Sequence, residues 1–255
     1  MAWLSGTFKS KTLRISSHFF AILPEYPTTA ENTLILLHGL GAAYDAWNQR
    51  SSIERYAATH NLAVVMPEVQ RSWYTDMAYG LPYFTFITQE FPEIMAHMFH
   101  VPIDPEHLYI GGLSMGGYGA LKCVLTAPER YAGCMALSAR CSVQNKLAAI
   151  KDDPAQIREW QAILGPDLTV KPENDLYALL SKIQAPAKSP RFYVACGTED
   201  FLYRESVEMA AALKRTFTDV TYEEWHGIHD WAFWDVAIQH GIKLMFPGDN
   251  GSIVQ

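Results

Sequence analysis

A serine lies at the centre of a glycine-rich pentapeptide, Gly112-Leu-Ser-Met-Gly116. A short apolar run at residues 108–110 precedes it, and a helix-forming segment follows it as far as about Thr126. The pattern G-x-S-x-G between a strand and a helix is typical of a sharp turn that projects the serine hydroxyl above the edge of a sheet. The free N–H groups at the start of the helix would face any negative charge that develops there. We therefore predict that Ser114 is a nucleophile, the alternative being a serine that only caps the helix.

A serine hydroxyl is a weak nucleophile unless a base removes its proton, and the base needs a carboxylate to fix its tautomer. In parallel sheets such groups lie just beyond the carboxyl ends of the strands. Asp200 follows the strand predicted at 191–195, and His229 follows the strand predicted at 220–225. Serine, acid and histidine in this chain order match the α/β-hydrolase arrangement. The sequence thus predicts Ser114, Asp200 and His229 as the catalytic residues.

Three neighbouring residues compete for these roles. His226 precedes His229 by three positions but sits at the strand end, so we interpret it as a structural residue or as one that supports a catalytic residue. Glu199 and Asp230 are alternatives to Asp200, although most such charges are solvated surface groups. Asp230 would also have to fold back onto the histidine beside it.

No group of residues has the spacing of a metal site. The pairs His226-x-x-His229 and His97-x-x-His100 lack a cysteine or carboxylate partner at a metal spacing. None of the four cysteines forms a C-x-x-C pair, and three of them lie within apolar runs. We expect buried free thiols in a reducing compartment, and neither a metal nor a cofactor. The cysteines are Cys123, Cys134, Cys141 and Cys196.

The negative charge that forms when a nucleophile attacks a carbonyl needs two backbone N–H donors. One donor is expected from Met115, the residue after the nucleophile. The other is expected from Leu40, in the loop after the strand predicted at 33–37. Gly39 and Gly41 flank Leu40 and would let this loop approach a substrate, although the same residues also fit a tight turn.

The elements that must position these groups alternate between strands and helices. Apolar runs predict strands at 33–37, 62–66, 108–110, 131–138, 191–195 and 220–225, and a hairpin within 8–23 that turns near Ser16-Ser17. Apolar residues at helical spacing predict helices at 52–60, 83–99, 117–126, 204–217 and 231–245. This alternation predicts an α/β fold with a mostly parallel central sheet and helices on both faces.

The length of 255 residues fits one α/β domain that spans residues 1–255. Within it, residues 140–190 are polar and helix-prone, with no clear strand. We predict that this stretch is a compact cap-like insertion over one end of the sheet.

Charge and hydropathy exclude several classes of partner. The formal net charge is −7 and the isoelectric point is about 5.7, which argues against nucleic acid or an anionic membrane. The sequence contains no run of about 18 apolar residues, so no transmembrane helix is expected. Residues 1–9 lack the charged start and apolar run of a secretory signal peptide, so no such peptide is expected there. The sequence leaves self-association into a homo-oligomer open.

Aromatic residues cluster near the predicted site. Trp73 and Tyr79 belong to the loop at 71–80, and Trp231 lies two positions after the predicted base. Because a loop between a strand end and a helix lies on the catalytic rim in this architecture, we predict that these rings wall a pocket for acetyl to butyryl groups. The alternative is that they pack the core.

Five blocks distributed along the chain resemble the esterase D family, and the chain is most similar to its bacterial tributyrin esterases. The blocks are Leu37-His-Gly-Leu-Gly41, Ser72-Trp-Tyr-Thr-Asp-Met-Ala-Tyr-Gly80, Gly111-Gly-Leu-Ser-Met-Gly-Gly-Tyr-Gly119, Cys196-Gly-Thr-Glu-Asp-Phe-Leu-Tyr203 and Gly227-Ile-His-Asp-Trp231. The resemblance implies an α/β-hydrolase fold and a cytoplasmic serine carboxylesterase that acts on short-chain acyl esters through an acyl-enzyme. It places the family's triad on Ser114, Asp200 and His229, and its oxyanion donors on Leu40 and Met115.

The resemblance also leaves other substrates open. The family often has Ser-Gly after the strand at 131–138, whereas this chain has Ser138-Ala-Arg140. An S-formylglutathione hydrolase-like thioesterase would need basic groups, for which Arg71 and Arg140 are candidates. A feruloyl or acetyl-sugar esterase is a further alternative, although a secreted one would need a signal peptide. A non-catalytic relative would have lost a triad member, and none is lost.

Overall fold

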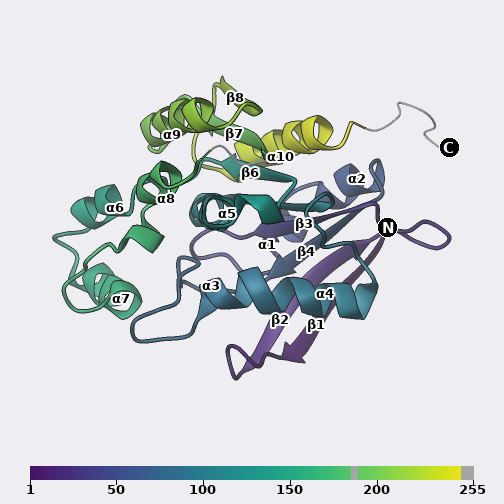
Figure 1. The fold of residues 1–255 in the computed structure, drawn as a ribbon, viewed down its shortest axis with the longest axis horizontal. Helices are drawn as coiled ribbons and strands as arrows, with labels where there is room; N and C mark the ends of the chain where they lie inside the picture. The colour runs from purple at the N-terminus through teal and green to yellow at the C-terminus, as the bar shows by residue number, and fades with distance from the viewer. Residues whose placement is uncertain (185–188, 248–255) are drawn as a thin grey trace.

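The computed structural model describes residues 1–184 and 189–247, whose strands form one eight-stranded sheet. The order across the sheet is β1-β2-β4-β3-β5-β6-β7-β8, with β1 and β2 at one edge and β7 and β8 at the other (Figure 1). β1 and β2 pair in the antiparallel sense, as do β2 and β4, and all other neighbours are parallel. The strands are β1 (Ala2–Lys9), β2 (Ser16–Leu23), β3 (Asn32–Leu37), β4 (Leu62–Pro67), β5 (Leu108–Leu113), β6 (Gly133–Leu137), β7 (Arg191–Gly197) and β8 (Val220–Trp225).

Helices cover both faces of this sheet, as the alternating pattern predicted. The helices are α1 (Ala46–Arg50), α2 (Ile53–Ala58), α3 (Tyr83–Thr85), α4 (Phe91–Phe99), α5 (Met115–Thr126), α6 (Val143–Ala149), α7 (Pro154–Leu164), α8 (Leu176–Ser181), α9 (Tyr203–Thr216) and α10 (Trp231–Met245). Three short helical turns are η1 (Phe86–Glu90), η2 (Pro128–Arg130) and η3 (Pro172–Asn174).

The two faces of the sheet form two hydrophobic cores. Successive side chains of a strand point to opposite faces, so Leu34 and Leu36 enter one core while Ile35 and Leu37 enter the other. Residues of α1, α2 and α10 cover the first face, and residues of α4, α5 and α9 cover the second. Burial on both faces explains why these strands are continuous apolar runs in the sequence.

The N-terminal hairpin differs from the prediction. β1 begins at Ala2, and Ser16-Ser17 lies inside β2 rather than in the turn. The Glu90 carboxylate explains the turn, because it accepts hydrogen bonds from residues 10–12. A carboxylate contributed by a helix 80 positions away is invisible to a local pattern.

The helix predicted at 83–99 is three consecutive segments, α3, η1 and α4. η1 is a π turn that ends two residues before Pro92, the second residue of α4. Proline has no N–H to donate to the preceding turn, so the regular helical ladder cannot pass through this point. Helix α1 was not predicted.

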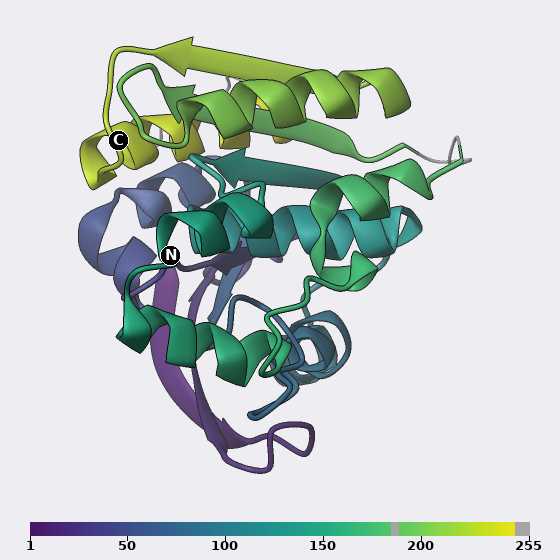
Figure 2. The same ribbon diagram turned by 90° about the vertical axis from the view of Figure 1, so that its left-hand side faces the viewer.

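The stretch at 140–190 contains α6, α7, η3 and α8. Figure 1 shows α6 and α7 at the left-hand side of the molecule, and Figure 2 views the molecule from that side. Two of these helices are capped by aspartates, since Asp153 accepts backbone N–H bonds at the start of α7 and Asp175 does so at α8. The described part of this stretch, residues 140–184 and 189–190, therefore forms short helices and no strand, and the cap-like insertion stays a prediction.

Candidate active site

Ser114 occupies the turn between β5 and α5. Its backbone adopts φ 54° and ψ −114°, a conformation that costs a non-glycine residue on the order of 1–3 kcal/mol. The turn is tight, since a Cβ on Gly116 would lie 2.5 Å from the Leu37 carbonyl oxygen. Strain of this kind persists where the surroundings enforce it, and here it exposes one serine side chain at the end of a buried strand.

A chain of hydrogen bonds connects Ser114 with the two other predicted residues. His229 Nε2 lies 3.0 Å from Ser114 Oγ, and His229 Nδ1 lies 2.8 Å from Asp200 Oδ2. The three side chains follow β5, β7 and β8, so the carboxyl ends of three strands bring them together. This geometry allows the imidazole to accept the serine proton while the carboxylate holds the other ring nitrogen.

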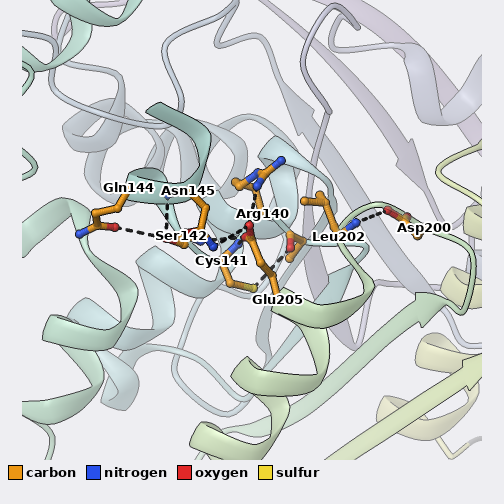
Figure 3. A network of polar contacts seen from close by, with 9 residues as sticks. Arg140, Cys141, Ser142, Gln144, Asn145, Asp200, Leu202 and Glu205 are labelled. Atoms are coloured by element: carbon orange, nitrogen blue, oxygen red, sulfur yellow. Dashed lines mark hydrogen bonds and ion pairs between the residues drawn. The ribbon is translucent and has the colours of Figure 1, made fainter. Parts of the chain in front are cut away.

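The Asp200 carboxylate is held in its charged form. Its side chain is fully buried, and Oδ1 accepts a hydrogen bond of 2.8 Å from the Leu202 backbone N–H (Figure 3). Burial acts to raise the pKa of Asp200, but hydrogen bonds from His229, Leu202 and Ser138 outweigh it and leave the pKa below its ordinary value. The acid is therefore ionised at neutral pH and can stabilise a positively charged imidazole.

The competing residues have other partners. His226 is 92% exposed and pairs with Glu199 at 3.1 Å. A hydrogen bond from the Gly227 backbone N–H, with another from Thr198, lowers the pKa of Glu199 to about 2. Asp230 caps α10 by accepting a hydrogen bond from the Phe233 N–H.

The loop that contains Leu40 lies against Ser114. A Cβ on Gly39 would come within 3.7 Å of Ser114 Cβ, so the backbone of this loop lies beside the serine. Met115 is the first residue of α5. In the part of the chain that the structure describes, neither the Leu40 N–H nor the Met115 N–H has a backbone hydrogen-bond acceptor. Two unpaired donors are thus available on adjacent segments.

A cavity of about 420 Å³ opens beside Ser114 and His229. Most of its lining residues are small or apolar, and α1 with the residue before it contributes the polar side chains of Asp45, Gln49 and Arg50. The lining residues are Gly39, Leu40, Gly41, Ala42, Ala43, Asp45, Ala46, Gln49, Arg50, Leu113, Ser114, His229, Trp231 and Trp234. Trp231, predicted to contact substrate, belongs to this wall.

The two other predicted substrate-binding rings lie elsewhere. Trp73 is buried against Trp160, with ring centroids 4.9 Å apart, and Tyr79 is 69% exposed. Neither is among the residues that line the cavity beside Ser114. The reason is that their loop pairs with the end of α7, where the Tyr79 N–H donates to the Ala162 carbonyl.

Two aromatic rings that sequence reasoning missed contact the imidazole of His229. Phe201 lies 4.5 Å from it between ring centroids, and Trp234 lies perpendicular to it at 4.9 Å. The Trp234 indole N–H also donates to the hydroxyl of Ser138, a residue with a positive φ of 43°. The sequence did contain a signal for Trp234, because it lies one helical turn beyond Trp231 and therefore shares its face of α10.

A second polar network adjoins the site and centres on Glu205 in the first turn of α9 (Figure 3). One oxygen accepts from Arg140 Nη1 at 2.5 Å and from Asn145 at 3.2 Å, and the other accepts from the backbone N–H groups of Cys141 and Ser142. The Arg140 backbone N–H in turn donates to the Ser114 carbonyl oxygen at 3.3 Å. The network thus joins the segment after β6 to the helix that follows Asp200.

The chain is similar to known esterases along most of its length. The family described as "Putative esterase" matches residues 10–244. An acetyl esterase of Caldicellulosiruptor saccharolyticus is 34% identical, and the match covers 96% of this chain and 98% of the relative. An S-formylglutathione hydrolase of Rattus norvegicus is 26% identical over 69% of this chain and 68% of its own length.

Solved structures from Staphylococcus aureus are similar along nearly the whole chain. The substrate-bound fluorophosphonate-binding serine hydrolase F is 35% identical with a TM-score of 0.85, and covers 96% of this chain and 98% of its own. An S-formylglutathione hydrolase apoenzyme from the same organism is 35% identical with a TM-score of 0.83 and the same coverage.

Proposed function

The chain belongs to this family of esterases, and from that premise we propose that it hydrolyses short-chain carboxylic esters through an acyl-enzyme on Ser114. Its class, a serine-dependent carboxylic ester hydrolase acting on small-molecule esters, follows from its relatives. Beyond this class, we propose the acyl chain length, tributyrin as a model substrate, and the role of each residue. The observation that carries it is the hydrogen-bonded series Ser114, His229 and Asp200 at the wall of a cavity.

In the first half-reaction, Ser114 Oγ attacks the ester carbonyl carbon while His229 Nε2 takes the hydroxyl proton. The carbonyl oxygen becomes an oxyanion, which the N–H groups of Leu40 and Met115 stabilise. When the intermediate collapses, the bond to the alcohol oxygen breaks and His229 returns its proton to the leaving alcohol. Asp200 remains ionised throughout and stabilises the imidazolium.

In the second half-reaction, water takes the place of the serine hydroxyl. His229 removes a proton from water as it attacks the acyl-enzyme, and the same two N–H groups hold the new oxyanion. Collapse releases the carboxylic acid and returns the proton to Ser114 Oγ. No group beyond the chain's own residues and water is needed for either half.

The cavity supports a preference for short acyl chains. Its apolar wall combines the small side chains of Ala42, Ala43 and Ala46 with the rings of Trp231 and Trp234. Each methylene that fits there contributes about 0.8 kcal/mol of burial, and a longer chain meets the indole rings. We therefore expect kcat/KM to increase from acetyl to butyryl esters and to fall for longer ones.

A thioesterase acting on an S-acyl glutathione is a second candidate, supported by the names of several relatives. The two arginines suggested by the sequence are already paired, Arg71 with Glu159 and Arg140 with Glu205. Arg50, in contrast, lines the cavity and has no ion-pair partner among residues 1–184 and 189–247. It is the cation best placed to meet a substrate carboxylate.

The expected cytoplasmic location remains part of this proposal. It is supported by four cysteines that are all free and buried, as expected for a reducing compartment. No α-helix in the described ranges has both the length and the apolar character that a membrane span requires. Homo-oligomer formation stays open and can be measured by light scattering.

The test is a substrate series on the purified protein. We would measure kcat/KM for p-nitrophenyl esters of two to twelve carbons, for tributyrin and for S-formylglutathione, with wild type, Ser114→Ala and Trp231→Ala. We expect an optimum near butyrate, loss of turnover and of fluorophosphonate labelling in Ser114→Ala, and a longer optimum in Trp231→Ala. A wild-type preference for the longest esters, or labelling that persists without Ser114, would contradict the proposal.

A further inference from the structure

The hydroxyl of Tyr74 reaches the loop that contains the proposed oxyanion donor. It donates a hydrogen bond of 2.8 Å to the backbone carbonyl of His38, two positions before Leu40. Tyr74 is fully buried, so this bond is shielded from water. The bond acts on the peptide unit that joins His38 to Gly39, and Gly39 lies against Ser114. The bond therefore acts on the part of the loop that lies beside the nucleophile.

Tyr74 itself is held in an unusual conformation. Its φ is 50°, and Gln70 and Trp73 in the same loop have φ values of 54° and 53°. Three non-glycine residues with positive φ in five positions are energetically unfavourable and must be enforced by their surroundings. The Tyr74 ring packs against α5 at Gly119, where an added Cβ would lie 2.5 Å from ring carbons.

Lys122 supplies the enforcing contact. Its side chain is buried in α5, and Nζ donates to the Tyr74 carbonyl at 3.0 Å, to Thr75 Oγ1 at 3.2 Å and to Asn174 Oδ1 at 2.7 Å. The ammonium also lies 4.4 Å from the centre of the Phe84 ring. All three of its N–H groups are used, so Lys122 has no donor left for a ligand and acts as an anchor.

We propose that Tyr74 is a positioning residue for the oxyanion hole, and that Lys122 anchors it to the same helix that begins beside Ser114. The nucleophile and the oxyanion donor are then both held in place by one rigid element, α5, although Leu40 lies far from α5 in the sequence. This inference rests on the proposed function, because the position of the Leu40 N–H matters only when a negative charge develops on a substrate carbonyl. It predicts an effect on the transition state and not on substrate binding.

The test compares Tyr74→Phe with Tyr83→Phe. Both tyrosines are buried in the same core, but the Tyr83 hydroxyl has no hydrogen-bond partner among the described residues. Tyr74→Phe keeps the ring and removes only the bond to His38. Deleting an oxyanion donor costs about 10²–10³-fold in kcat, so displacing one should cost about 10–100-fold with KM unchanged. The rate of fluorophosphonate labelling should fall in parallel, and Tyr83→Phe should match wild type.

A third variant, Lys122→Met, tests the anchor. Its kcat should fall at least as far as that of Tyr74→Phe, and the double variant should lose less than the sum of the two effects, because both act through one contact. A kcat of Tyr74→Phe within twofold of Tyr83→Phe would overturn the inference while leaving the proposed function intact. So would a raised KM with unchanged kcat. A wild type inert to both esters and fluorophosphonate would overturn the proposed function, and this inference with it.

Discussion

The imidazole of His229 owes its orientation to more than its two hydrogen bonds. Phe201 and Trp234 contact the ring, and its side chain is only 18% exposed. Two aromatic neighbours restrict rotation about χ2, so Nε2 remains directed at Ser114 while Nδ1 remains on Asp200. At the scale of single residues, the geometry of the site therefore depends on these two aromatic neighbours of His229 as well as on the types of its polar residues.

His229 and His226 have different surroundings, so replacing each one should have a different effect on kcat. His229→Ala should lower kcat by several orders of magnitude, as removal of a triad base does, with folding retained. His226→Ala should change kcat by less than threefold, because its side chain is exposed and its carboxylate partner is Glu199. Steady-state kinetics on p-nitrophenyl butyrate would measure both, and a larger loss in His226→Ala would reverse the assignment.

At the scale of elements, Glu205 joins two segments that carry the site. It lies in the first turn of α9, which follows Asp200, and it accepts four hydrogen bonds from the segment after β6. The Glu205 and Arg140 side chains are 10% and 12% exposed. A buried carboxylate with four donors is satisfied only while these two segments stay together.

Glu205→Gln should therefore destabilise the protein by about 3–5 kcal/mol, as expected when one partner of a buried ion pair is removed. The control in the same helix is Glu208→Gln, whose partner Arg204 is 90% exposed and whose ion pair contributes about 0–1 kcal/mol. Urea denaturation followed by tryptophan fluorescence would measure both. Equal losses in the two variants would show that the buried network does not join the segments.

At the scale of the whole molecule, Lys122 connects three regions that are distant in the chain. It holds α5, the loop that contains Tyr74 and Thr75, and η3 through one buried ammonium group. Burial removes this cation from water, and the loss of solvation lowers its pKa from 10.5 to about 8. The buried positive charge of Lys122, which holds these three regions together, therefore opposes folding at neutral pH.

This shift predicts a pH dependence of stability. Between pH 8 and 10.5 the unfolded chain keeps the Lys122 proton while the folded chain loses it, so the unfolded state binds more protons and the contribution to stability rises with pH. The free energy of unfolding of wild type minus that of Lys122→Met should thus increase across this window and be constant below it. Taking the difference cancels the titration of buried tyrosines. A flat difference from pH 7 to 10.5 would contradict the lowered pKa.

The sequence by itself determined the class of fold and which residues could form the site. Strand and helix periods are local, and in a parallel sheet the residues just beyond each strand must converge at one edge. This is why Ser114, Asp200 and His229 could be proposed together although they lie on three separate elements. The order of the three residues along the chain, serine, then acid, then histidine, also matched the α/β-hydrolase arrangement.

The tertiary structure alone decided what each polar or aromatic side chain meets. Trp73 and Tyr79 were predicted to wall the acyl pocket, but their loop pairs with α7, which no local pattern reveals. Lys122 resembles a surface residue in the sequence, yet it is buried because three acceptors from distant segments surround it. Burial of a polar group depends on partners that only the folded chain brings within hydrogen-bonding distance, whereas the period of a strand or helix depends on its own neighbours.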